Sequence, residues 1–197
     1  MPAAAREITQ SDILPDAQFA RERVQRRADL LPVKRLRRIA LGPICTFYFE
    51  TFETMLFQVQ EMLLTEKGGE AQLANELAAY NPLIPQGREL VATVMFEIDD
   101  PARRDAALRS LGRVDDHFFL RLGDNRIAGT PEGDIERTRD DGKTSSVHFL
   151  RFTLSDEVVA AFRDPTVPAM IGCDHPSYGH LAMISPDSRA ELARDFA

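Results

Sequence analysis

The stretch YNPLIPQGRELVATVMFEI, residues 80–98, joins two different sequence patterns. Its Asn-Pro pair ends a helical pattern, because the residue before a proline disfavours the helical conformation, and its Pro-Gln-Gly predicts a turn. Residues 89–98 are apolar and β-branched, which is typical of a buried strand. We therefore expect a helical segment over residues 1–87 and an α+β segment over residues 88–197, in one compact unit that shares a core.

The residues before this stretch have the periodicity of helices. The strongest helix prediction covers residues 46–67, TFYFETFETMLFQVQEMLLTEK, which contain no Gly or Pro and are followed by Gly68-Gly69. Two further helices are predicted over residues 16–31, where Pro32 interrupts the pattern, and over residues 70–80. The first half of the chain should therefore be helical.

The second half combines strands with short helices. Residues 124–146 are polar and rich in Gly and Asp, and we expect a hairpin or a surface excursion there. Helices are predicted after Asp100, Ser155 and Ser185, each a good N-cap. Further strands are predicted over residues 117–122, 147–154, 167–171 and 178–184. The fold class is therefore α+β, a helical N-terminal half packed on a mixed or antiparallel sheet with flanking helices in the C-terminal half.

The charge of the chain argues against nucleic-acid binding. The 197 residues carry a net charge of -7, with a pI near 5.2, whereas affinity for nucleic acid depends on Lys and Arg. Residues 18–38 are the exception, with eight basic side chains against two acidic ones, a local charge of +6. This segment is either a solvated helix face or a docking surface for an acidic partner, a phosphate or a membrane surface. Its basic residues are Arg21, Arg23, Arg26, Arg27, Lys34, Arg35, Arg37 and Arg38.

Nothing in the sequence indicates export or membrane insertion. Cys45 and Cys173 lie far apart, which gives no disulfide framework or zinc-knuckle spacing. The N-terminal residues have no apolar core of secretory length, and no apolar run approaches the roughly 20 residues that span a bilayer. We expect a cytoplasmic protein.

The helix predicted over residues 46–67 carries acidic residues that are candidates for a site. Phe57 and Leu64 lie among its glutamates, so this back face should be covered, either by another helix of the chain or in a homodimer. Buried carboxylates must be paired, protonated or metal-bound, and for Glu50 and Glu53 salt bridges to the basic segment compete with a metal or acid-base role. The candidate cofactor-binding residues are Glu50, Glu53, Gln60 and Glu61.

The sequence CDHPSYGH, residues 173–180, concentrates reactive side chains in a predicted turn. Imidazole, thiolate and carboxylate groups suit iron or zinc, and a histidine there could act as a general base. Structural roles in a turn and in adjacent strands explain the same residues. The catalytic candidates are His175, Asp174 and Tyr178, and the metal-ligand candidates are His175, His180, Cys173 and His117.

The chain resembles a bacterial family known as domain of unknown function 3501, from about Ile8 to Phe196. The motifs that carry the resemblance are Gly42-Pro43, Phe49-Glu50, the Gln58/Gln60/Glu61 run, Tyr80-Asn81, Leu83-Ile84-Pro85 and Asp174-His175-Pro176. The resemblance implies a genomic context with rubrerythrin and an iron-sulfur oxidoreductase, and hence peroxide defence or iron and redox housekeeping. It implies no known reaction and no assigned catalytic residues.

Two functions follow from these observations. The first is a non-catalytic accessory or binding protein of a rubrerythrin-linked system, which docks a rubrerythrin-like or iron-sulfur redox partner through its basic helix. The alternative is a small metalloprotein or enzyme that uses the turn at residues 173–180. The sequence leaves open whether the protein is an enzyme.

Overall fold

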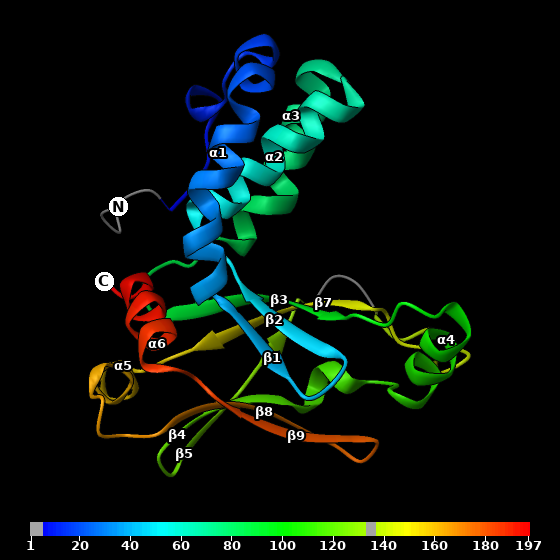
Figure 1. Ribbon diagram of the computed structural model, residues 1–197, viewed down its shortest axis with the longest axis vertical. Coiled ribbons are helices and arrows are strands. Elements are labelled where there is room, and N and C mark those ends of the chain that lie inside the picture. Colours follow the sequence, from blue (N-terminus) through cyan, green and yellow to red (C-terminus); the bar gives the residue numbers. More distant parts are fainter. Residues whose placement is uncertain (1–5, 133–136) are drawn as a thin grey trace.

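A helical layer packs on a pair of antiparallel β-sheets in the computed structural model of the protein, which describes residues 6–132 and 137–197 (Figure 1). The helical layer comprises α1, α2 and α3, and three shorter helices flank the sheets. The helices are α1 (Asp16–Leu36), α2 (Phe52–Glu66), α3 (Gly69–Tyr80), α4 (Pro101–Ser110), α5 (Asp156–Arg163) and α6 (Pro186–Leu192). Short 3-10 turns are η1 (Gln10–Asp12), η2 (Asn81–Leu83), η3 (Val114–His117) and η4 (Ala193–Asp195). The α+β class predicted from the sequence is confirmed.

Both sheets are antiparallel throughout. The first sheet has the order β1-β2-β3-β7-β6, and the second has the order β5-β4-β8-β9. The strands are β1 (Arg38–Leu41), β2 (Cys45–Phe49), β3 (Glu89–Phe96), β4 (Phe118–Leu122), β5 (Asn125–Ala128), β6 (Thr130–Pro131), β7 (Val147–Thr153), β8 (Ala169–His175) and β9 (Tyr178–Met183). The strands β2 and β3 are neighbours in the sheet, although α2 and α3 lie between them in the chain.

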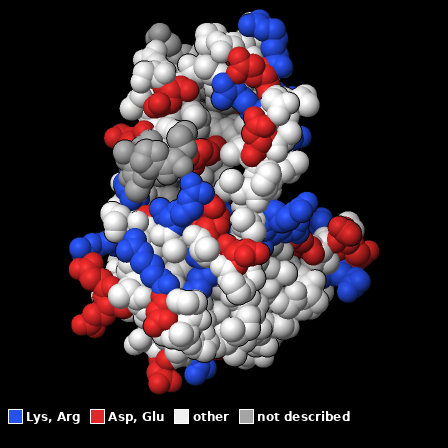
Figure 2. Space-filling view, turned by 60° about the vertical axis from the view of Figure 1, so that its left-hand side comes forward, with Lys and Arg blue, Asp and Glu red and all other residues white. Residues whose placement is uncertain are grey.

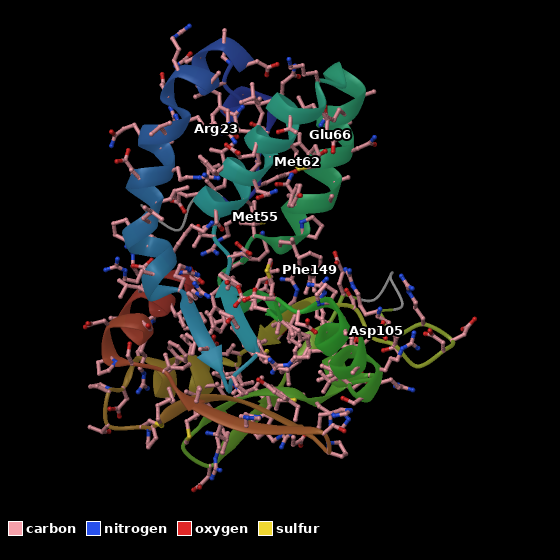
Figure 3. The ribbon with its side chains drawn as sticks, turned by 45° about the vertical axis from the view of Figure 1, so that its right-hand side comes forward. Arg23, Met55, Met62, Glu66, Asp105 and Phe149 are labelled. Atoms are coloured by element: carbon pink, nitrogen blue, oxygen red, sulfur yellow. The ribbon has the colours of Figure 1, made fainter. Side chains whose placement is uncertain are left out.

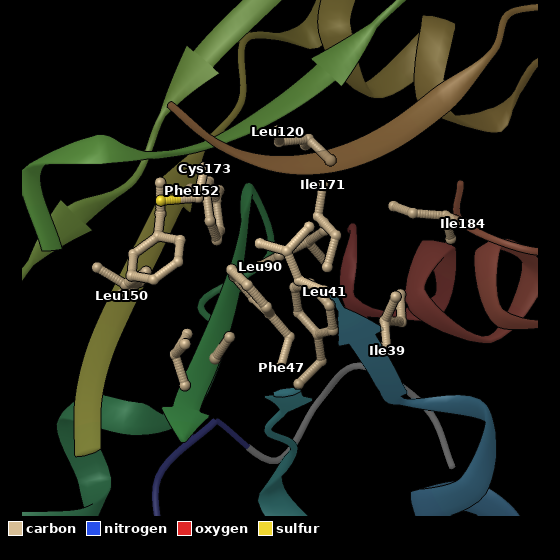
Figure 4. Close-up of a cluster of buried hydrophobic side chains, with 14 of the residues drawn as sticks. Ile39, Leu41, Phe47, Leu90, Leu120, Leu150, Phe152, Ile171, Cys173 and Ile184 are labelled. Carbon is tan, nitrogen blue, oxygen red and sulfur yellow. The ribbon is translucent and has the colours of Figure 1, made fainter. Parts of the chain in front are cut away.

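The main hydrophobic core lies between the two sheets (Figure 4). Phe47 of β2, Leu90 of β3 and Phe152 of β7 meet Leu120 of β4 and Ile171 of β8, and all five side chains are fully buried. A second cluster, which includes Met55 and Val59 of α2 and Val91 of β3, joins the helical layer to the opposite face of the first sheet. Strand β3 is therefore buried on both faces, which explains why its sequence is apolar almost without interruption.

The helix predicted over residues 46–67 is wrong at its N-terminal end. Residues 45–49, CTFYF, form β2, because their β-branched and aromatic side chains pair with β3 and fill the core. Helix α2 begins only at Phe52, where the Thr51 hydroxyl accepts a hydrogen bond from the backbone N–H of Thr54. The first 87 residues therefore contribute β1 and β2 to the sheet, and whether the chain divides at residue 87 stays a prediction.

Other element boundaries also differ from the sequence-based expectation. Helix α1 continues through Pro32 to Leu36, although a proline inside a helix removes one hydrogen bond. Strand β8 continues to His175, so most of the predicted turn at residues 173–180 belongs to the β8–β9 hairpin. The polar region 124–146 contains β5, β6 and an isolated bridge between residues 138 and 144, while residues 133–136 of that prediction lie outside the described residues.

Arg37 joins the helical layer to the sheet and to the C-terminal helix. Its side chain is 2% exposed, its Nε donates to the Phe49 carbonyl at 3.0 Å, and its Nη2 donates to the Glu50 carbonyl at 3.0 Å. It also pairs with Asp195 and lies 3.6 Å from a Glu191 carboxylate oxygen. Burial raises the pKa of Asp195 to about 6, although the charge and hydrogen bond of Arg37 act in the opposite direction.

Arg189 of α6 makes a second buried anchor. It is 8% exposed, and its guanidinium donates to backbone carbonyls at and just after the C-terminal end of α5, those of Ala161, Phe162, Asp164 and Val167. The last carbonyls of a helix have no partner within the helix, so this side chain satisfies groups that would otherwise be buried without hydrogen bonds.

Among the described residues, no helix is long and apolar enough to cross a membrane.

Candidate functional site

The β8–β9 hairpin brings three of the predicted site residues together. The His117 Nδ1 atom lies 2.9 Å from Asp174 Oδ1, and the rings of His117 and His175 have centroids 5.0 Å apart. Arg126 of β5 donates to Asp174 Oδ2 at 2.7 Å. The hydrogen bond from Arg126, more than that from His117, lowers the pKa of Asp174. This carboxylate is about half exposed and already shared by two partners, which is typical of a surface ion-pair network.

His175 is engaged in structural hydrogen bonds through both ring nitrogens. Its Nδ1 accepts from the backbone N–H of Ser177 at 3.1 Å, so Nε2 carries the proton and donates to the Gly112 carbonyl at 3.2 Å. The residue is 7% exposed. A general base or a metal ligand needs a free ring nitrogen, and this geometry leaves none.

The other residues of the hairpin are also held structurally. Burial raises the pKa of the Cys173 thiol to about 11 and that of the Tyr178 phenol to about 12, so both groups are protonated near neutral pH. The Tyr178 hydroxyl donates to the Leu41 carbonyl at 2.5 Å and ties β9 to β1. The His180 ring lies against Tyr178, with centroids 4.2 Å apart, and against Gly42.

The proposed metal ligands do not assemble into a metal centre in the described part of the chain. Across residues 6–132 and 137–197, no three side chains of His, Cys, Asp or Glu are grouped so that they could hold a metal ion. His117 and His175 are neighbours, but the Cys173 thiol is buried and protonated, and the His180 ring lies against Tyr178 and Gly42. The structure therefore gives no support to the predicted iron or zinc site.

Two of the four cofactor-binding candidates, Gln60 and Glu61 of α2, have structural roles. Gln60 is 3% exposed and clamps the N-terminal segment, since its side chain both accepts from and donates to the backbone of Leu14. Glu61 accepts two hydrogen bonds of 2.6 Å from Arg23, which joins α2 to α1. A salt bridge to the basic segment was expected for Glu50 and Glu53, and it is found instead at Glu61.

The back face of α2 is covered by α1 of the same chain. Phe57 packs edge-on against Phe19 of α1, with ring centroids 5.6 Å apart, and Leu64 is partly buried. The covering expected from the sequence is therefore intramolecular. This face is therefore not available for a homodimer contact, and the oligomeric state stays a prediction.

Glu50 is the candidate that faces a cavity. The space has a volume of about 400 Å³ and lies between the helical layer and the first sheet, where Met55 of α2 is directed toward the strand that carries Phe149 (Figure 3). The Glu50 carboxylate is at its wall, with Oε1 accepting from the Thr93 hydroxyl at 2.6 Å and Oε2 from the Thr54 hydroxyl at 2.7 Å. Glu53 lies in the first turn of α2 and does not line the cavity.

A second depression, the α1–α2 groove, adjoins this cavity. It has a volume of about 840 Å³, and Lys34, Tyr48, Thr54 and Gln58 line both spaces. Charged side chains of both signs gather where the helical layer meets the strands (Figure 2). Within the groove itself the basic residues predominate, and these are Arg27, Lys34, Arg35 and Arg38.

Sequence reasoning found Glu50 but missed the residues that surround it. Thr93 is the polar residue in the middle of an apolar strand, and that interruption is a signal for a buried polar partner. Tyr80 and Phe149 carry no such signal, because aromatic residues at a helix end and in a strand are ordinary core residues. Only the packing of α2 and α3 on the sheet brings them to the cavity.

The fold and the cavity define an α+β protein in which a helical layer covers a ligand-sized space on one face of a two-sheet core. The chain belongs to the family described as "Protein of unknown function (DUF3501)", whose model matches residues 7–196. A crystal structure of a protein of unknown function from Burkholderia pseudomallei K96243 is similar over 96% of this chain and 99% of that chain, with 37% identity and a TM-score of 0.89. No functionally curated protein shows significant similarity to the chain.

Proposed function

We propose that this protein is an accessory binding protein that docks an acidic surface of a redox partner through the α1–α2 groove. The observation that carries the proposal is the concentration of free positive charge there. Arg27, Lys34 and Arg35 form no ion pair with any of the residues in the described ranges, whereas Arg23, Arg26 and Arg38 each pair with a glutamate. On a chain of net charge -7, this local excess favours an acidic partner and accelerates its association.

The same surface of α1 exposes apolar side chains. Val24 is 79% exposed and Leu31 is 58% exposed, and both are large hydrophobic residues. Positions 24, 27, 31 and 35 fall on one face of a helix, so Val24 and Leu31 alternate with Arg27 and Arg35 along a single stripe. Apolar side chains surrounded by cations are typical of a protein-protein interface. Burial of the apolar side chains gives affinity, and ion pairs made by the cations give specificity.

What the family resemblance implies supports one class of partner. We propose a rubrerythrin-like or iron-sulfur redox protein as the partner and peroxide defence or iron and redox housekeeping as the process, in the cytoplasm. The alternative, a small metalloprotein or enzyme that uses residues 173–180, has less support, because His175, Tyr178 and Asp174 are all committed to hydrogen bonds within the protein.

The test is a binding measurement between the purified full chain and a purified rubrerythrin from the same organism. The double variant Arg27→Glu/Arg35→Glu should weaken binding at least tenfold, and the affinity of the unaltered protein should fall as salt is raised. The matched control is Arg103→Glu/Arg139→Glu, which reverses the same number of charges at exposed positions outside the groove and should leave binding unchanged. Equal loss in both variants, or no binding by the unaltered protein, would overturn the proposal.

A further inference from the structure

The cavity beside Glu50 has the size and construction of a small-molecule site. Its volume of about 400 Å³ falls within the range of about 300–1,000 Å³ that is usual for such sites. Its walls combine apolar and aromatic side chains, including Met55, Tyr80 and Phe149, with a few polar groups. The walls come from α2, from the end of α3 and from β7, so the helical layer and the sheet hold them in fixed positions.

Glu50 gives the interior of this cavity a specific chemical preference. The residue is 9% exposed, and its carboxylate oxygens accept hydrogen bonds from two neutral hydroxyl groups, those of Thr54 and Thr93. Within the described ranges, no Lys, Arg or His side-chain nitrogen lies within 4.0 Å of the Glu50 carboxylate oxygens. Buried carboxylates in proteins are usually paired with a cation, because hydroxyl groups alone compensate poorly for the lost hydration.

The neighbouring charges do not neutralise this carboxylate. Arg37 lines the cavity, but its charge is met by Asp195 and Glu191, and it donates to the Glu50 backbone carbonyl rather than to the side chain. Lys34 is exposed and lines both the cavity and the α1–α2 groove, which places it where the two spaces meet.

Tyr80 at the end of α3 also lines the cavity. Burial raises the pKa of its phenol, a hydrogen bond with Gln58 acts in the opposite direction, and the carboxylates of Glu76, Glu66 and Glu50 add to the effect of burial. Of the described residues that line the cavity, Glu50 alone carries a carboxylate, and much of the remaining wall is apolar. A positively charged group would gain from the Glu50 carboxylate and from the face of the Tyr80 ring.

We propose that this cavity binds a small organic ammonium ion. Its N–H groups donate to Glu50, and its apolar body lies against Met55, Tyr80 and Phe149. Binding would give the buried carboxylate the cationic partner that the described residues do not supply. The proposal rests on the cavity alone and is independent of the docking function of the α1–α2 groove.

The experiment is a calorimetric titration of the purified full chain at pH 7 with three probes of similar shape. 2-Phenylethylamine carries the ammonium group, 2-phenylethanol is its neutral counterpart, and 3-phenylpropionate is an anion. We expect saturable binding of the amine, with the alcohol and the acid at least tenfold weaker. Equal affinity for amine and alcohol, or no binding of the amine at millimolar concentration, would overturn the proposal.

Two variants locate the binding. Glu50→Gln keeps the shape of the side chain but removes its charge, and it should lower the affinity for the amine at least tenfold. The matched control Glu53→Gln removes a charge from the same helix region outside the cavity and should bind the amine as the unaltered protein does.

A third variant guards against misfolding of Glu50→Gln. Met95→Phe enlarges a side chain that lines the cavity, leaves Glu50 in place and should weaken binding of the amine by reducing the available space. Circular dichroism of every variant checks that it is folded. Amine binding that survives Glu50→Gln, or that is unaffected by Met95→Phe in a folded protein, would refute the assignment.

Discussion

Replacement of Arg37 by methionine should destabilise the protein far more than the same change at the next residue, Arg38. Arg37 is 2% exposed and has three backbone acceptors and two carboxylate partners, whereas Arg38 is 55% exposed and pairs with Glu97, itself 42% exposed. Removing one partner of a buried ion pair leaves the other charge uncompensated and costs about 3–5 kcal/mol. An exposed pair contributes less than about 1 kcal/mol.

Urea unfolding followed by circular dichroism measures this difference. With a slope of about 2 kcal/mol per molar urea, Arg37→Met should lower the midpoint by about 1.5–2.5 M, and Arg38→Met by less than about 0.5 M. Arg37→Lys should lie between them, because an ammonium keeps the charge but cannot reach both the Phe49 and Glu50 carbonyls in the way that a guanidinium does. The reasoning is refuted if Arg37→Met and Arg38→Met shift the midpoint equally.

Three further predictions concern other parts of the structure. The pKa of Asp195 is raised from 3.8 to about 6, so its stabilising contribution is present below pH 4 and is lost as the pH rises through 6. Between pH 7 and pH 4, the free energy of unfolding of the unaltered protein should therefore increase by up to about 3 kcal/mol relative to that of Asp195→Asn, as measured by urea titrations. Arg189→Met should cost about 3 kcal/mol in the same assay, since buried carbonyls at the end of α5 lose their donor, and a cost below 1 kcal/mol would contradict that role. Gly42→Ala should lower the melting temperature, because the new Cβ would lie 2.3 Å from the His180 ring and the backbone φ of +67° disfavours alanine. Adding His180→Ala to this variant should restore part of the lost melting temperature, and no restoration would mean that the contact is unimportant.

Local sequence pattern was sufficient for most elements of the fold. The segments that became α3, α4 and α5 carry recognisable caps and breakers, and β3 and β7 are apolar or alternating as strands should be. The junction between β2 and α2 was missed because CTFYFETF contains no Gly or Pro, and the boundary depends instead on the Thr51 cap and on pairing with β3. Such pairing between distant segments leaves no local trace in the sequence.

The candidate site was predictable only in part, for a similar reason. Glu50 could be found, because Phe57 and Leu64 among the glutamates of the predicted helix indicate a covered face, but its partner Thr93 lies 43 positions away. Arg37 was counted among the basic residues of a helix face, whereas it is buried by Asp195 and Glu191 from the other end of the chain. Both cases show that the role of a charged residue is decided by tertiary partners that the local sequence does not reveal.

The position of α2 and α3 between two adjacent strands has a consequence for the order of events during folding. Antiparallel neighbours are commonly joined by a turn of a few residues, which lets them meet early, but β2 and β3 must close a much longer connection. Local helices form within about a microsecond, faster than distant segments of a chain find each other. We therefore expect formation of the α2–α3 pair to shorten the gap before β2 and β3 associate, so that helices outside the sheet influence how fast it closes.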